Sequence, residues 1–163
     1  PAGGVGKEKG RMWDRMGFFT GNLPLDLAIL SWLAAQLIKT VINLARGQGL
    51  ALSRMLGSGD MPSSHSAFIC AATASIGQIC GWRSPLFSLS AAMALVVMYA
   101  ACNVRRAAGE QAKLLNYVRE HWEDLPEEFQ GKKLNEHLGH TLPQVIMGAL
   151  LGTAIGLAGP ILW

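Results

Sequence analysis

Residues 66–104, SAFICAATASIGQICGWRSPLFSLSAAMALVVMYAACNV, decide the fold, because in this stretch Arg83 is the single charged side chain. Residues 66–82 and 84–104 form uncharged runs of 17 and 21 residues. A helix needs about 20 residues, or roughly 17 at the short end, to cross the hydrocarbon core of a bilayer. Only a short turn at residues 81–85 separates the two runs. We therefore expect two antiparallel transmembrane helices here.

Two further runs, residues 25–44 and 143–163, also have the length and apolar character of membrane spans. The last one carries Gly148, Gly152 and Gly156, one small residue every four positions. Such a stripe lets another helix approach closely in lipid. It would serve packing within the chain or a homo-oligomer, and the sequence leaves both open.

The composition agrees with a polytopic membrane protein. Half of the 163 residues are hydrophobic and 15% are charged, against about a quarter charged in soluble domains. A soluble bundle of buried helices would need polar faces at helical spacing, which the last two spans lack. The net charge of +3, without an aromatic and basic strip, gives no indication of nucleic acid binding. We predict an all-α membrane bundle with four principal transmembrane helices.

The regions outside the spans have a different character. Residues 1–21 are basic and rich in glycine, which predicts a flexible N-terminal tail before a membrane domain at residues 22–163. Residues 107–122 combine apolar and charged side chains at helical spacing, which is typical of an amphipathic helix on the membrane surface. The chain opens with Pro1 rather than Met, so the sequence leaves a removed targeting segment open.

Polar residues lie at one end of each of the four spans. Because consecutive spans cross the membrane in alternating directions, these four ends all lie on the same side of the membrane. The set consists of Lys39 near the end of the first span, Ser63, Ser64 and His65 at the start of the second, Arg105 and Arg106 after the third, and His140 before the fourth. Helix N-termini and arginines bind phosphate. Two histidines beside a bound phosphate can divide phosphoryl transfer, one attacking phosphorus as a neutral imidazole and the other protonating the leaving oxygen. Gln36, one turn before Lys39, is a further candidate for a hydrogen bond in this site.

The stretch at residues 61–67, MPSSHSA, resembles the second motif of the superfamily of type-2 phosphatidic acid phosphatases and vanadium haloperoxidases. The chain is most similar to the divergent branch of small bacterial and plastid membrane proteins. The other similar stretches are QLIK at 36–39, MYAACNVRRAAGEQA at 98–112, and LGHT at 138–141 with Val145 and Gly148. The resemblance covers the chain from about residue 24 to residue 160.

The resemblance implies a hydrolase, a membrane phosphatase that acts on a lipid or polyprenyl phosphate or diphosphate through a phosphohistidine. It implies no metal and no other cofactor. His140 matches the nucleophile and His65 matches the general acid. The groups that match the phosphate-binding residues are Lys39, Ser63, Ser64, Arg105 and Arg106.

Several positions depart from the family's pattern. An acidic residue commonly lies four positions after the nucleophile and orients its imidazole, whereas this chain has Gln144, which can accept a hydrogen bond from the ring but adds no charge. The branch commonly has Asp at the position of Ala100, and Gly at the positions of Asp60 and Asn103. Asp60 adds negative charge beside the anion site unless it pairs with an arginine or holds a cation. These departures favour an alternative function, a catalytically weakened protein that binds, transports or scaffolds a lipid phosphate.

A metal site is a weaker alternative, in which His137 and His140 would join His65 or Asp60. The distribution of basic residues indicates how the protein is oriented in the membrane. Eight of them lie on the side of the proposed site and five on the other side. This bias favours a site that faces the cytoplasm, or the stroma in a plastid. We expect an integral protein of a bacterial inner membrane or a plastid membrane, in contact with membrane lipids and an amphiphilic phosphate substrate.

Overall fold

The computed structural model describes residues 17–47, 61–122, 126, 133–136 and 138–162. Its elements in chain order are α2 (Leu23–Ala45), α4 (Ser64–Cys80), α5 (Pro85–Tyr99), the π-helical segment η1 (Ala100–Val104), α6 (Arg105–His121) and α7 (Leu142–Leu162). The described part of the chain contains helices and no strands, so the predicted all-α fold is confirmed.

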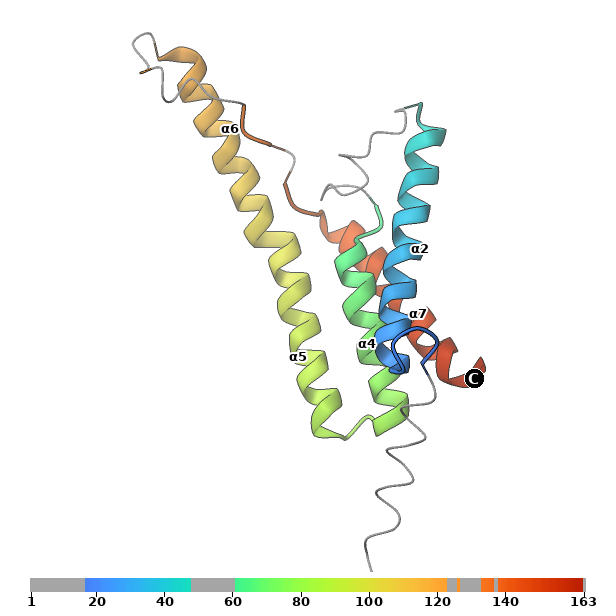
Figure 1. Cartoon of the computed structure of the whole chain (residues 1–163). Helices are drawn as coiled ribbons and strands as arrows, with labels where there is room; N and C mark the ends of the chain where they lie inside the picture. Colours follow the sequence, from blue (N-terminus) through green and yellow to red (C-terminus); the bar gives the residue numbers. More distant parts are fainter. Residues whose placement is uncertain (1–16, 48–60, 123–125, 127–132, 137, 163) are drawn as a thin grey trace, which may run out of the picture.

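Helix α4 lies at the centre of the bundle and packs against α2, α5 and α7 (Figure 1). Three of the described helices are long and apolar enough to cross a membrane, namely α2, the continuous helix Pro85–His121, and Leu142–Gly159 of α7. With 17 residues, α4 rises about 26 Å, which is at the short end for a span. Large apolar side chains such as Leu37 and Leu95 are exposed on the outside of the bundle, where lipid would cover them.

Side-chain caps explain where three of the helices begin. A cap accepts a hydrogen bond from an N–H group that has no partner within the first helical turn. The caps are Asn22 for α2, Ser63 for α4 and Ser84 for α5, which accept from the N–H groups of Leu25, Ser66 and Phe87 at 3.1, 3.4 and 3.1 Å. Proline follows the cap in the first turn of α2 and of α5, where its missing N–H costs nothing.

Residues 17–21 fold back onto the start of α2. The buried carboxylate of Asp26 accepts hydrogen bonds from the N–H of Phe19 at 2.9 Å, and from the N–H and the hydroxyl of Thr20 at 3.1 and 2.6 Å. The sequence predicts a flexible tail over residues 1–21. Residues 1–16 of that tail lie outside the described residues, while residues 17–21 form this hydrogen-bonded turn.

The glycine stripe of α7 packs against α4 within the same chain. A methyl group added at Gly148, Gly152 or Gly156 would overlap a backbone carbonyl oxygen of α4 or of its N-cap. The three carbonyl groups belong to Ser63, Ala67 and Ala71. This close approach is what small residues allow between membrane helices. The stripe thus serves packing within the chain, and a homo-oligomer stays a prediction.

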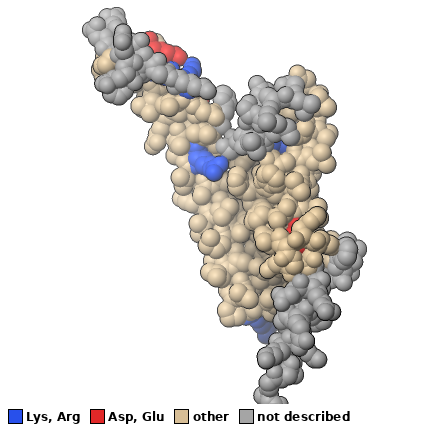
Figure 2. Space-filling view, in the orientation of Figure 1, with Lys and Arg blue, Asp and Glu red and all other residues tan. Residues whose placement is uncertain are grey.

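Helix α6 continues α5 through η1, so that residues 85–121 form one helix of 37 residues, about 55 Å long. Figure 1 shows α6 extending beyond the end of α4 in the direction of α5. The sequence predicts the amphipathic helix but not its continuity with the third span. In Figure 2, lysine and arginine side chains lie where α5 passes into α6, and α5 itself carries no charged residue.

Candidate functional site

The residues that the sequence singles out come from the same end of the bundle, opposite the turn between α4 and α5 (Figure 1). His65 lies in the first turn of α4, Arg105 begins α6, and His140 lies two residues before α7. Lys39 lies in the later part of α2. The charges of Lys39 and Arg105 act on both imidazoles. The topology expected from alternating spans therefore gathers these groups into one electrostatic environment.

His140 is buried, with 2% of its surface exposed, and its two ring nitrogens have no hydrogen bond of good geometry within the described residues. Burial lowers the pKa of His140 from 6.5 to about 4, and the positive charge of Lys39 acts in the same direction. The side chain of Gln144 opposes this shift. The ring is consequently neutral at pH 7, which is the form that can attack phosphorus.

This neutral ring makes stability depend on pH. The unfolded imidazole gains a proton below about pH 6.5, whereas the folded ring stays neutral until the pH nears 4, so acid favours the unfolded chain. We expect the wild type to lose about 2 kcal/mol more of its unfolding free energy between pH 7 and pH 5 than His140→Gln does. Denaturant titration of the detergent-solubilised proteins measures this difference. An equal loss of unfolding free energy in the two proteins would contradict a neutral His140 ring.

The backbone of His140 is held against the π-helical segment. The N–H of His140 donates a hydrogen bond to the carbonyl oxygen of Ala101 in η1 at 3.0 Å. Gly139 has a φ of +94°, and a methyl group there would lie 2.6 Å from the backbone nitrogen of Arg106. A π-helical segment interrupts the regular hydrogen-bond register of a helix, and such segments are frequent at functional sites. Here it ties the candidate nucleophile to the helix that carries the arginines.

Helix α6 also holds the segment that leads to His140. The side-chain amide of Asn116 donates to the carbonyl oxygen of Leu134 at 2.9 Å and to the carboxylate of Glu136 at 2.7 Å, and its oxygen accepts from the N–H of Leu134 at 3.0 Å. A methyl group at Gly109 would lie 2.8 Å from the carbonyl oxygen of Glu136. The segment thus runs along the buried face of α6.

Asn116 was not predicted to hold the segment before His140. Its signal was present, because Gly109, Ala112 and Asn116 are the buried residues of α6 and recur three and four positions apart. Such a stripe of small and amide side chains indicates that another segment of backbone packs closely on that face. By contrast, the carbonyl oxygen of Ala101 leaves no signal in the sequence, because every residue carries one.

We expect Asn116→Leu to weaken the support of His140. The change removes three hydrogen bonds to residues 134–136 and should lower the unfolding free energy by about 1–3 kcal/mol. Displacement of the candidate nucleophile should also lower the rate of any phosphate release, about 10- to 100-fold. The matched control is Gln111→Leu, an exposed polar residue of the same helix. Equal behaviour of the two variants would contradict the positioning role.

The start of α4 supplies backbone N–H groups and a link to α7. Ser63 and Ser64 are buried, and the N–H of Ser63 donates to the carbonyl oxygen of Gln144 at 3.0 Å. The hydroxyl oxygen of Ser63 accepts from the hydroxyl of Ser66 at 3.0 Å in addition to its capping bond. The first N–H groups of a helix have no partner inside it, and together they carry partial positive charge. Those of Ser64 and His65 can therefore bind an anion.

The remaining candidates have distinct surroundings. Lys39 is buried at 2% exposure, which differs from a lysine that extends along the outside of a bundle into water. The side-chain oxygen of Gln36 is buried without a hydrogen-bond partner among the described residues. Arg105 and Arg106 are exposed at the start of α6. Of these cations, Lys39 and Arg105 act on both imidazoles with their positive charge. Gln36 adds a hydrogen-bond acceptor one turn before Lys39 on α2.

Gln144 has a function in the structure that the sequence did not suggest. Its side-chain oxygen accepts a hydrogen bond from the N–H of Thr141 at 2.8 Å, so it caps the first turn of its own helix. The ring of His140 has no hydrogen bond of good geometry to it. Asp60, another departure from the family's pattern, lies outside the described residues. Ala100 and Asn103 both lie in η1.

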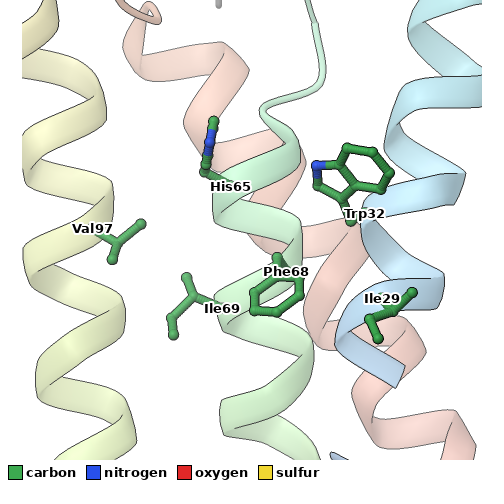
Figure 3. Close-up of a pocket in the computed structure, with 6 residues that line it drawn as sticks. All are labelled: Ile29, Trp32, His65, Phe68, Ile69 and Val97. Atoms are coloured by element: carbon green, nitrogen blue, oxygen red, sulfur yellow. The ribbon is translucent and has the colours of Figure 1, made fainter. Parts of the chain in front are cut away.

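The alternative metal site includes Asp60 and His137, which both lie outside the described residues. Among the residues that the structure does describe, no group of three His, Cys, Asp or Glu side chains is arranged to hold a metal ion. The two described histidines of this alternative, His65 and His140, differ in access. His140 is buried and His65 is exposed at the edge of an apolar cavity (Figure 3).

Comparison with known proteins agrees with this architecture. The chain matches the family described as the divergent PAP2 family over residues 20–155. It is 37% identical over 147 residues to the uncharacterized membrane protein YuiD of Bacillus subtilis (strain 168), an alignment that covers 83% of this chain and 92% of that protein. No solved structure matches the chain. Together with the apolar helices, these similarities identify an integral membrane protein.

Proposed function

The chain belongs to the divergent PAP2 family, and from this premise we propose that it is a membrane phosphatase that hydrolyses a lipid or polyprenyl phosphate or diphosphate. The observation that carries the proposal is the buried, neutral imidazole of His140 in the field of Lys39 and Arg105. A neutral nucleophile beside fixed cations is what attack on a phosphate dianion requires.

The proposed reaction has two steps. A ring nitrogen of His140 attacks phosphorus, the bond from phosphorus to the ester oxygen breaks, and protonated His65 gives its proton to that oxygen as it leaves. Lys39, the arginines and the N–H groups at the start of α4 stabilise the equatorial oxygens. In the second step, neutral His65 takes a proton from water, which attacks the phosphohistidine. Inorganic phosphate leaves, and both imidazoles return to their first state.

The depth of the site favours an amphiphilic substrate. The 20 residues from Pro85 to Val104 rise about 30 Å, the thickness of the hydrocarbon core, so that Arg105 lies at the level of the lipid headgroups. A lipid phosphate presents its phosphate at this level. The excess of basic residues on this side favours a site on the cytoplasmic or stromal face of a bacterial inner membrane or a plastid membrane.

A second candidate function is binding of the lipid phosphate without turnover. It is favoured by Gln144, which caps α7 and brings no negative charge to His140. The test is phosphate release from a panel of prenyl, alkyl and diacylglycerol phosphates by the purified protein, with and without a chelator. Release that persists in chelator supports the phosphatase. Headgroup binding without release, in the wild type and in Gln144→Glu, supports the binding protein.

A further inference from the structure

An apolar cavity of about 590 Å³ lies between α2, α4 and α5 (Figure 3). Its volume falls in the range of small-molecule pockets, about 300–1,000 Å³. The lining consists of Ile29 and Trp32 of α2, His65, Phe68 and Ile69 of α4, and Val97 of α5. All three helices belong to the apolar bundle, so the cavity lies at the depth of the membrane.

The cavity is polar at one end and apolar at the other. Figure 3 shows His65 and the indole nitrogen of Trp32 at the same end, with the side chains of Ile29, Phe68 and Ile69 further along. An indole combines an apolar body with a polar N–H, which suits the boundary between headgroup and hydrocarbon. This gradient of polarity matches an amphiphile whose head lies at His65.

His65 connects the cavity to the phosphate site. In the proposed reaction His65 protonates the ester oxygen that leaves, so the first carbon of the leaving group must lie next to its ring. The cavity begins at the same ring and continues along α4 to Ile69. The four residues of α4 from His65 to Ile69 rise about 6 Å, so the lining of the cavity contacts only the first few carbons of a hydrocarbon chain.

We infer that this cavity is the leaving-group subsite of the enzyme, and that it binds the first carbons of the hydrocarbon chain attached to the phosphate. The inference rests on the proposed function and deepens it. The subsite recognises the chain beside the ester oxygen, whereas the remainder of the chain lies in the bilayer. Selectivity is therefore set by the shape of the leaving group near the phosphate rather than by the total chain length.

The kinetic test compares hexyl phosphate with ethyl phosphate, because both have an unactivated alkyl leaving group and only hexyl phosphate reaches along the cavity. Val97→Trp and Ile69→Trp fill the cavity from two helices. We expect each to lower the ratio of kcat/KM for hexyl over ethyl phosphate at least about tenfold. The matched control is Leu95→Trp, at a position of α5 that is 66% exposed and outside the lining. Filled variants that keep the wild-type ratio would overturn the subsite.

A crosslinking test does not depend on turnover. Hexyl phosphate with a photoreactive diazirine at its end should label α2, α4 or α5 at the cavity, and the filled variants should lose this label. Labelling at the cavity without hydrolysis of any phosphate in the panel would support the cavity as the binding site of the alkyl chain but overturn the proposed phosphatase, and with it the role of the cavity in holding a leaving group. Labelling elsewhere would overturn the subsite. Labelling should also be competed by unlabelled hexyl phosphate more strongly than by phosphatidylcholine. Equal competition by phosphatidylcholine would overturn the subsite, since an ordinary bilayer lipid would then be the occupant.

Discussion

His140→Ala is expected to abolish phosphate release, with a loss of at least about 10³-fold in kcat. The imidazole forms the covalent bond to phosphorus in the proposed reaction, and alanine has no atom that can replace it. Cations and N–H groups that remain can still bind the substrate, so KM should change less than kcat. The measurement is phosphate release in detergent micelles from the lipid phosphate that the wild type hydrolyses best.

The control for this variant is His121→Ala, which removes an exposed histidine at the end of α6. The ring of His121 stacks on Tyr117 and takes no part in the proposed reaction. The His121→Ala substitution should leave the rate of phosphate release unchanged within about twofold, since surface substitutions have small effects. Retention of more than a tenth of the wild-type rate by a folded His140→Ala protein would show that another group attacks phosphorus.

His65→Ala has the second largest expected effect, and this effect depends on the leaving group. A general acid contributes about 10²- to 10⁴-fold when the leaving oxygen is a poor leaving group, as in an alkyl phosphate. With 4-nitrophenyl phosphate the leaving oxygen needs no proton, so formation of the phosphohistidine should be nearly unaffected. Burst kinetics with the two substrates separate this first step from the hydrolysis that follows.

The leaving-group dependence distinguishes acid catalysis from a structural role. If His65→Ala slows the first step equally for both substrates, His65 helps to shape the site but does not protonate the leaving oxygen. If it slows neither substrate, the acid is another residue. Ser64→Ala, a neighbouring change in the first turn of α4, serves as the comparison for effects on phosphate binding, because it should act on the two substrates alike.

Much of the fold follows from the apolar runs. Residues 66–82 were predicted as a span, and α4 occupies Ser64–Cys80, where Ser63 caps its start and Gly81 follows its end with φ of +90°. The runs specify which residues avoid water, whereas the caps set where each helix begins. The continuation of α5 into α6 was not predicted, since a change from apolar to charged residues indicates the end of the membrane and not the end of the helix.

The gathering of the site residues at one end was predictable from the alternation of the spans. What holds His140 there was not predicted. The carbonyl oxygen of Ala101 leaves no signal in the sequence, whereas the spacing of Asn116, whose side chain binds the carbonyl and N–H of Leu134, was a signal that was not used. The cap formed by Gln144 was also missed. A glutamine four positions after a histidine on a helix faces it, but at a helix start the N–H of Thr141 competes for the same oxygen.

The most direct test of the central claim is to identify the phosphorylated residue. Wild-type protein and His65→Ala, incubated with 4-nitrophenyl phosphate and quenched in alkaline denaturant, would be digested and sequenced by mass spectrometry. A phosphoryl group on the imidazole of His140, more abundant in His65→Ala because water attack is slowed, is the predicted result. Turnover with the phosphoryl group on another residue, or with no phosphorylated protein in either sample, would contradict it.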